Sequence, residues 1–151
     1  MIKIMAIDDY DALIALWKAT PNMGLRCLDD SREGIERFLR RNPTTCFTAW
    51  EDNRLTGAIL SGHDGRRGYI YHTVVLPEYR GHGLGTALVE AVVEALRREG
   101  ITRVCLNVME TNEPGKRFWT ARGWEKKDYL GFYSKAITDR KNLPLFSIQE
   151  A

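Results

Sequence analysis

The sequence lacks the features of three protein classes: membrane-spanning proteins, thiolate-metal proteins and strongly basic nucleic-acid binders. No apolar run approaches the roughly 20 residues that a membrane helix needs. The three cysteines form no Cys-x-x-Cys pair, and none stands beside a histidine at metal-ligand spacing, so we expect no metal site. The net charge is only +2, and no stripe of aromatic and basic residues marks a nucleic-acid surface.

A signal peptide is not expected either, because residues 1–9 have neither a long apolar core nor a small-residue cleavage site. We therefore expect a cytoplasmic protein. With 151 residues, 44% of them hydrophobic and 28% charged, the chain has the size and composition of one domain over residues 1–151. Cys46 and Cys105 lie in apolar runs and are interpreted as buried, inert thiols, whereas the interpretation of Cys27, in a loop, stays open.

The spacing of apolar residues and turn signals predicts strands and helices in the order βααβββαβαββ. Strands are predicted at residues 2–6, 44–50, 55–61, 69–76, 103–108, 124–127 and 132–137. Helices are predicted after a cap at Asp8 or Asp9, after a capping box of Asp30 and Glu33, and over residues 84–98 and 112–122. The fold class is therefore α/β: a mixed, mostly antiparallel sheet of about seven strands with four helices, in a three-layer α/β/α sandwich.

A glycine-rich loop lies where the predicted strand 69–76 ends and the helix 84–98 begins. Its sequence is Arg80-Gly81-His82-Gly83-Leu84-Gly85-Thr86. The first amides of a helix have no carbonyl partner within it and lie at the positive end of its dipole, and glycines let a phosphate approach the backbone. No lysine follows, which excludes a P-loop, and the third glycine comes one place too early for a dinucleotide fingerprint. The loop is therefore interpreted as a pyrophosphate cradle.

Two blocks of the sequence resemble the GNAT superfamily of N-acetyltransferases. The residues from Arg80 to Gly85 match its Gln/Arg-x-x-Gly-x-Gly/Ala signature. The second block is similar to another segment typical of that family: Leu106-x-Val108-x-x-x-Asn112, then Phe118-Trp119-x-x-x-Gly123-Trp124. The predicted order of strands and helices fits the family over nearly the whole chain. The resemblance implies a GNAT-like fold and acetyl-coenzyme A (acetyl-CoA) as co-substrate.

The resemblance also implies cofactor contacts, residue by residue. Backbone groups of Thr73, Val74 and Val75 would pair with the pantetheine arm, and the Val75 amide would stabilise the oxyanion. Asn112 would meet the cofactor from the last helix. The pyrophosphate would lie against the glycine loop, whose expected cofactor-binding residues are Arg80, Gly81, His82, Gly83, Leu84, Gly85 and Thr86.

Acetyl transfer to an amine needs a base, because a lysine-like amine with a pKa of about 10.4 costs ~4.6 kcal/mol to deprotonate at pH 7. Many relatives use a Tyr as acid where this chain has Trp119, and some use a Glu as base where it has Asn107. His72, on the strand that should line the acetyl group, is the candidate base. The candidate acids, in order of preference, are Tyr133, Tyr129 and Tyr71.

We expect an acetyl-CoA-dependent N-acetyltransferase that acts on a primary amine of a small molecule or a peptide by direct attack in a ternary complex. A non-catalytic acyl-CoA-binding module is the alternative hypothesis, because the usual Tyr and Glu are absent. Dimers are common in the family, so a homodimer stays open, and no nucleic-acid or membrane partner is expected. The candidate acceptor contacts are Trp17, Asn22, Met23, Arg26 and Phe132.

Overall fold

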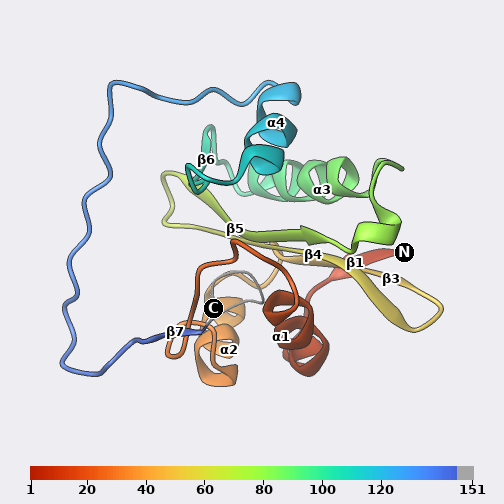
Figure 1. The fold of residues 1–151 in the computed structure, drawn as a ribbon, viewed down its shortest axis with the longest axis horizontal. Helices are drawn as coiled ribbons and strands as arrows, with labels where there is room; N and C mark the ends of the chain where they lie inside the picture. Colours follow the sequence, from red (N-terminus) through yellow and green to blue (C-terminus); the bar gives the residue numbers. More distant parts are fainter. Residues whose placement is uncertain (146–151) are drawn as a thin grey trace.

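The main sheet of the molecule lies between two layers of helices (Figure 1). In the computed structural model, which describes residues 1–145, α1 and α2 cover one face of this sheet and α3 and α4 the other. The helices are α1 (Tyr10–Lys18), α2 (Arg32–Arg41), α3 (Leu84–Arg98) and α4 (Glu113–Ala121). The strands are β1 (Ile2–Ile4), β2 (Leu25–Arg26), β3 (Phe47–Glu51), β4 (Arg54–His63), β5 (Gly68–Val75), β6 (Val104–Leu106) and β7 (Pro144–Leu145). The predicted fold class is confirmed, while the end of the expected 1–151 domain, residues 146–151, lies outside the described residues.

The main sheet has the strand order β1-β3-β4-β5-β6. Its first four strands are antiparallel, and Asp52 and Asn53, with φ of 50° and 61°, form the two-residue turn between β3 and β4. The pairing of β5 with β6 is parallel, because α3 provides the crossover connection between them. β2 and β7 form a separate small ladder. Within residues 1–145, no helix is both long and apolar enough to cross a membrane.

Two clusters of buried side chains hold the helical layers against the sheet. Under α1 and α2, Leu13 and Trp17 are fully buried and pack in one cluster with Ala58. Under α3, Leu88 packs in a second cluster with Ile59. Ala58 and Ile59 are successive residues of β4, so this strand is buried on both faces. Burying a large apolar side chain contributes about 1.5–3 kcal/mol, so each layer has its own hydrophobic attachment to the sheet.

The predicted helix starts were correct to within one residue but partly wrong in capping. Helix α3 begins and ends at the predicted residues. Helix α2 is capped by Ser31, whose Oγ accepts a hydrogen bond from Gly34 N–H at 3.0 Å, so the predicted capping box of Asp30 and Glu33 was wrong. Serine and aspartate both cap helices well, and here the second of the two adjacent candidates does so. This leaves the Asp30 carboxylate for contacts outside the helix.

The late strands predicted at 124–127 and 132–137 do not form within residues 1–145, and this prediction was wrong. Every residue from 125 to 141 is exposed, and this segment, named the arm below, runs from the end of α4 out to β7 (Figure 1). An alternating pattern becomes a strand only beside another strand that supplies hydrogen bonds, and the arm has no such neighbour in the described chain. The number of strands still agrees with the prediction because β2 and β7, which were not predicted, form instead.

Candidate functional site

The pairing of β5 with β6 ends before β5 does. The two strands pair from Gly68 with Val104 to Ile70 with Leu106, whereas β5 continues to Val75. Beyond Ile70, β5 therefore has no β6 partner among the described residues. Unpaired strand groups can hydrogen bond to an extended ligand that lies beside them. The end of β5 is thus a suitable surface for the amide-bearing pantetheine arm that the family resemblance implies.

The direction of the backbone groups distinguishes Val75 from Val74. Leu76 N–H donates to the Thr56 carbonyl of the β4 side at 2.8 Å, and hydrogen-bonded residues alternate along an antiparallel ladder. Val74 therefore directs its N–H and C=O at β4, while those of Val75 point away from β4. The Val75 carbonyl accepts from Arg80 Nε at 2.8 Å. The Val75 amide is thus free of the β4 ladder, whereas the backbone groups of Val74 are engaged in it.

A β-bulge interrupts β5 at His72 and Thr73. The register against β4 shifts between Ala58 and Leu60, so that His72 and Thr73 together oppose one residue of β4. His72 has a φ of +30°, and such backbone conformations cost a non-glycine residue on the order of 1–3 kcal/mol. Strain of this size persists only where surrounding contacts hold it. The contacts of the His72 side chain therefore have to hold this backbone conformation.

The His72 imidazole lies on the α1 and α2 side of the sheet, where Asp30 and Trp17 hold it. Its Nε2 is 2.7 Å from Asp30 Oδ1, and its ring meets the Trp17 ring edge-on with centroids 5.0 Å apart. The side chains of His72 and Asp30 are 12% and 5% exposed. Because a carboxylate accepts at Nε2, a neutral imidazole carries its proton there and has an acceptor lone pair on Nδ1. In that tautomer Nδ1 is the imidazole nitrogen that can accept a proton.

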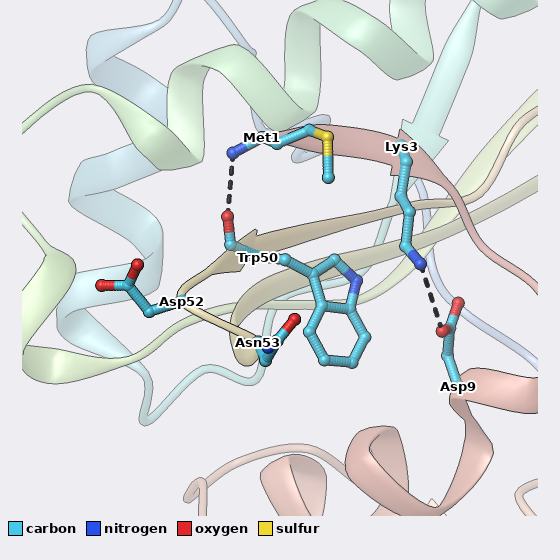
Figure 2. Close-up of a pocket in the computed structure, with 6 residues that line it drawn as sticks. All are labelled: Met1, Lys3, Asp9, Trp50, Asp52 and Asn53. Carbon is cyan, nitrogen blue, oxygen red and sulfur yellow. Dashed lines mark hydrogen bonds and ion pairs between the residues drawn. The ribbon is translucent and has the colours of Figure 1, made fainter.

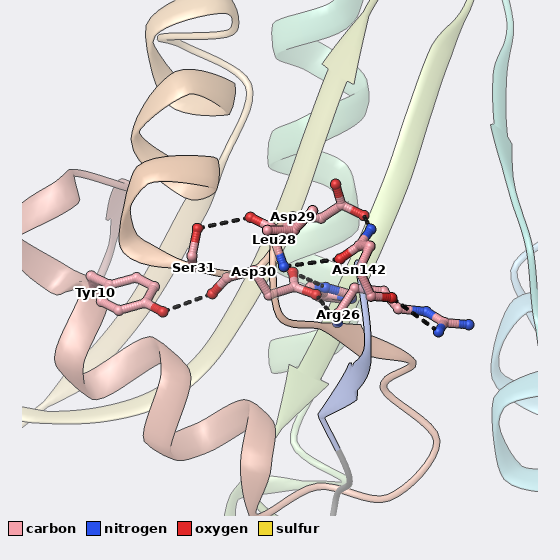
Figure 3. Close-up of polar contacts among 8 residues, drawn as sticks. Tyr10, Arg26, Leu28, Asp29, Asp30, Ser31 and Asn142 are labelled. Atoms are coloured by element: carbon pink, nitrogen blue, oxygen red, sulfur yellow. Dashed lines mark hydrogen bonds and ion pairs between the residues drawn. The ribbon is translucent and has the colours of Figure 1, made fainter. Parts of the chain in front are cut away.

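Asp30 is the residue of the candidate site that the sequence analysis did not select. It lies in the loop between β2 and α2, and its Oδ2 accepts from Arg26 N–H at 2.7 Å (Figure 3). Its carbonyl accepts from the Tyr10 hydroxyl at 2.7 Å. The sequence signal that could have identified Asp30 is the neighbouring Ser31. A serine that caps the helix leaves the Asp30 carboxylate available for other contacts. Its contact with His72 spans 42 residues, so no local pattern connects the two.

The glycine loop has the backbone shape and the open space that a phosphate group requires. Gly81 and Gly83 have φ of +81° and +86°, and a Cβ at either position would meet no protein atom within 4 Å. Gly83 is the N-cap of α3, with no side-chain cap among the described residues. The amides of Leu84, Gly85 and Thr86 begin the helix and need partners from outside it. The residues present therefore fit the pyrophosphate of coenzyme A.

Helix α4 is tied to the first turn of α3 and so joins the two sequence blocks. Arg122, at the end of α4, donates from Nε to the Thr86 hydroxyl at 2.7 Å and lies 3.7 Å from the Phe118 ring centroid. Asn112 is the N-cap of α4, and its Oδ1 accepts from Gly115 N–H at 3.0 Å. Cofactor contacts of Asn112, and of the exposed residues Arg80 and His82, stay predictions.

Two of the three candidate acids, Tyr133 and Tyr129, are not brought together with His72. Tyr133 and Tyr129 lie on the arm and are 92% and 80% exposed, so their own chain does not bring them to β5. Tyr71 lies on β5, where burial raises the pKa of its phenol. Trp119, at the position of the usual Tyr, packs in T-shaped contacts with the rings of Phe118 and Trp124. The acid role of Tyr133 stays a prediction.

A separate hollow lies at the other edge of the sheet (Figure 2). It is lined by Met1, Lys3, Asp9, Trp50, Asp52 and Asn53. Two contacts join residues of the hollow to one another: the Met1 ammonium donates to the Trp50 carbonyl at 2.9 Å, and Lys3 pairs with Asp9 at 3.7 Å. Because β1 and β6 are opposite edges of the sheet, this hollow is not part of the candidate site. Over the described range, no group of three or more His, Cys, Asp or Glu residues is placed to hold a metal ion.

Known proteins share both the sequence pattern and the fold. The model of the acetyltransferase (GNAT) family matches residues 10–124. An acetyltransferase from Pectobacterium atrosepticum is 30% identical over 140 residues, which cover 93% of this chain and 98% of that protein.

Three solved structures, all under 25% identical, agree in fold. The PaiA N-acetyltransferase of Thermoplasma acidophilum in complex with coenzyme A has a TM-score of 0.74 at 19% identity and covers 85% of this chain and 91% of its own. The aminoglycoside N-acetyltransferase AAC(6')-Iy in complex with coenzyme A scores 0.69 at 19% identity, with 90% and 99% covered. A chain of the NatC complex bound to Gag peptide and coenzyme A scores 0.69 at 21% identity, with 84% and 85% covered. From the family match and the close relative, the chain belongs to the acetyltransferase (GNAT) family and is an acetyl-transferring enzyme with acetyl-CoA as its co-substrate.

Proposed function

We propose that this enzyme transfers the acetyl group to a primary amine of a small molecule or a peptide by direct attack in a ternary complex. The observation that carries the proposal is the arrangement along β5. The Val75 amide and the glycine loop lie at the end of this strand, and the His72–Asp30 pair lies on its α1 and α2 side. A donor surface and an acceptor surface thus meet at one strand, which supports transfer without a covalent enzyme intermediate.

The acceptor class is proposed from the fold and from the chemistry of this side of the sheet. One structural neighbour is an aminoglycoside N-acetyltransferase and another was solved with a bound peptide, so the fold accommodates small and peptide ligands. In this chain the exposed Asp29 lies next to Asp30 in the loop before α2. Carboxylates favour a cationic amine by Coulomb attraction. The amine would arrive as an ammonium and lose its proton at the site.

In the proposed reaction His72 takes a proton from the amine at Nδ1. The amine nitrogen then forms a bond to the acetyl carbon, the carbon–sulfur bond breaks with its electron pair leaving on sulfur, and the second proton of the nitrogen passes to the departing thiolate. A thiol with a pKa near 8.5 leaves with little help, so the base matters more than the acid. Asp30 is a positioning residue: it fixes the Nε2–H tautomer and stabilises the imidazolium that forms.

The Val75 amide is proposed to stabilise the negative charge that develops on the carbonyl oxygen. Its N–H points away from β4, and a donor fixed in this way is worth about 2.7–4 kcal/mol of barrier in other acyl-transfer enzymes. Thr73 is proposed to contribute backbone groups to the pantetheine arm from the bulge. The glycine loop, residues 81–86, would hold the pyrophosphate. None of these roles requires a metal ion.

The test measures thiol release from acetyl-CoA across a panel of aminoglycosides, polyamines, small primary amines and peptides with free N-termini. We expect transfer to at least one class, and we expect His72→Asn to lower kcat/KM by about 10²–10⁴-fold. The His72→Asn enzyme should also lose the acidic limb of the pH–rate profile while it keeps the wild-type Kd for acetyl-CoA.

His63→Asn is the matched control, because His63 lies at the far end of β4, within 3.9 Å of Glu99, and is not part of the site. It should retain wild-type kinetics. An unchanged acidic limb in His72→Asn would refute the base assignment. Tight acetyl-CoA binding without transfer to any amine would refute the proposed reaction and would favour the acyl-CoA-binding module instead.

A further inference from the structure

The bulge in β5 places two neighbouring side chains, Tyr71 and His72, on the same face of the sheet. Successive residues of a regular strand point to opposite faces. Here the Tyr71 ring meets the Phe38 ring of α2 edge-on, with centroids 5.8 Å apart, and the His72 ring meets Trp17 of α1. Both side chains therefore lie on the α1 and α2 side. The strained backbone of His72 thus brings the candidate base next to an aromatic ring.

Tyr69 extends this aromatic surface along β5. Its ring centroid lies 5.2 Å from that of Tyr71, and the two ring planes are inclined by 32°. Ile70, between the two tyrosines, packs in the cluster under α3, so the tyrosine side chains point to the other face. Tyr71 is 44% exposed in spite of its contacts with Phe38 and Tyr69. These three rings, Phe38, Tyr69 and Tyr71, are called the aromatic wall, and part of it is open to solvent beside His72.

The charge beside the aromatic wall is negative. Asp29, in the loop that leads into α2, is exposed, and its charge is one of the causes that raise the pKa of the Tyr71 phenol, after burial and a neighbouring tyrosine. Within residues 1–145 no ion pair neutralises Asp29, whose side-chain partner is the amide of Asn142, with Nδ2 donating at 2.7 Å (Figure 3). The Arg26 guanidinium contacts the Asn142 carbonyl instead, at 3.5 Å.

Aromatic rings and a carboxylate without a cationic partner together favour an organic cation. The face of a ring attracts a cation through its quadrupole, and a carboxylate attracts it by Coulomb interaction. The reacting amine is not the cation that this surface retains, because it must lose its charge before it attacks the thioester. The aromatic wall therefore suits a second cationic group of the acceptor.

We propose that the aromatic wall and Asp29 form a subsite for a second cationic group, so that the enzyme prefers acceptors with two positive charges to acceptors with one. This inference rests on the proposed function. While one amine of the acceptor lies at Nδ1 of His72, the other stays protonated, contacts the face of the Tyr71 ring and pairs with Asp29. Adjacent residues have Cα atoms only about 3.8 Å apart, so a spacer of a few methylene groups connects the two amines.

A comparison of 1,4-diaminobutane with butylamine tests the subsite, because both acceptors have a four-carbon chain and they differ by one charge. For wild type we expect kcat/KM to favour the diamine by about 10²-fold, since a cation–π contact and a charge-assisted hydrogen bond are each worth roughly tenfold. Tyr71→Leu and Asp29→Asn should each lower this preference by about tenfold, mainly through the KM for the diamine.

Tyr71→Phe separates the ring from the hydroxyl. It keeps the aromatic face, so it should keep the wild-type preference for the diamine, whereas loss of an acid would lower kcat for both acceptors alike. A preference reduced as far in Tyr71→Phe as in Tyr71→Leu would overturn the proposed role of the ring.

Asp52→Asn is the matched control for Asp29→Asn. It removes the same charge from an exposed residue in the turn between β3 and β4, away from the candidate site, and should keep the wild-type preference. Because Asp29 is also exposed, Asp29→Asn tests the subsite without a change in either core cluster. Thermal unfolding verifies that Tyr71→Leu is folded.

Equal kcat/KM for the diamine and butylamine in wild type would overturn the proposal, as would a preference that survives both Tyr71→Leu and Asp29→Asn. A higher kcat/KM for phenethylamine than for the diamine would also overturn it, since the wall would then hold an aromatic group.

Calorimetric titration of the enzyme–coenzyme A complex with the diamine distinguishes this inference from the proposed function. Binding that weakens about tenfold in Asp29→Asn, without transfer to any amine, would support the subsite and refute the reaction. Transfer to other amines without any binding of the diamine would refute the subsite alone.

Discussion

The donor side and the acceptor side of the proposed site are built in different ways. On the donor side the cradle comes from one continuous stretch, residues 81–86, and uses backbone amides. On the acceptor side, His72, Asp30 and Trp17 come from β5, a loop and α1, and they meet through side chains. The cradle depends on local backbone shape, whereas the acceptor side exists only after the whole sheet has formed.

Backbone strain is placed differently on the two sides as well. Gly81 and Gly83 adopt positive φ at little cost, because they have no Cβ. His72 adopts a φ of +30° with a bulky side chain, so its conformation must be held by other contacts, here with Asp30 and Trp17. A change in the cradle should therefore affect the binding of acetyl-CoA, whereas a change on the acceptor side should affect the rate of the acetyl-transfer step.

The largest effect is expected from Asp30→Asn. Asp30 accepts from His72 Nε2, and an amide at this position can donate instead, which favours the other imidazole tautomer and occupies Nδ1 with a proton. We expect kcat to fall by about 10²-fold or more, with KM for acetyl-CoA unchanged. Steady-state kinetics and the pH–rate profile of the variant check this.

Glu33→Gln provides the control for Asp30→Asn. Glu33 is an exposed residue in the first turn of α2, three positions away, and the same loss of charge there should leave kcat at the wild-type value. If Asp30→Asn kept full kcat, or if its KM for acetyl-CoA rose in parallel with the loss of kcat, Asp30 would be no more than a structural residue of the loop.

A smaller effect, confined to the donor side, is expected from Gly83→Ala. The matched control is Gly100→Ala, at the other end of α3, because both glycines have φ above +80° and open space at the Cβ position. Each variant should lose about 1–2 kcal/mol of stability to the left-handed backbone conformation. Only Gly83→Ala should raise the KM for acetyl-CoA, by about tenfold, which corresponds to one charge-assisted hydrogen bond.

Thermal unfolding and KM measured on both glycine variants separate strain from binding. Equal losses of stability with unequal KM would support the cradle. Equal KM values in the two variants would show that the phosphates do not occupy the space beside Gly83. The glycine loop would then not be the pyrophosphate cradle of the donor side.

What the sequence could predict follows from the same distinction. The glycine loop and the whole of α3 were predicted residue by residue, because a strand end, three glycines and a helix start are local signals. His72 was selected as a base from its place on β5. Its partner Asp30 was assigned to a helix cap, since adjacent Asp and Ser residues compete for that position and only the tertiary contact with His72 separates them.

The arm is the second place where local patterns were not sufficient. Residues 132–137 have the composition of a strand, but strand formation depends on a neighbour, and the sequence does not say whether that neighbour belongs to the same chain. The strands β2 and β7 were missed for the opposite reason. Each is only two residues long, and they pair over more than 100 positions, too short and too distant for any periodic signal.

The smallest effect is expected at Asn142, which anchors the chain just after the arm by hydrogen bonds to Leu28 and Asp29. Cysteine labelling measures this effect. Cys46 is buried under α1 and α2, and burial raises the pKa of its thiol to about 12, so at pH 8 only about one molecule in 10⁴ carries the reactive thiolate. Cys27 Sγ accepts from the N–H of Leu143, two residues beyond the arm, at 3.1 Å. Iodoacetamide labelling followed by mass spectrometry should modify Cys27 and leave Cys46 intact. Asn142→Ala, which removes hydrogen bonds worth about 1 kcal/mol, should speed Cys27 labelling about fivefold, whereas an unchanged rate would mean that the anchor does not limit access to this side of the site.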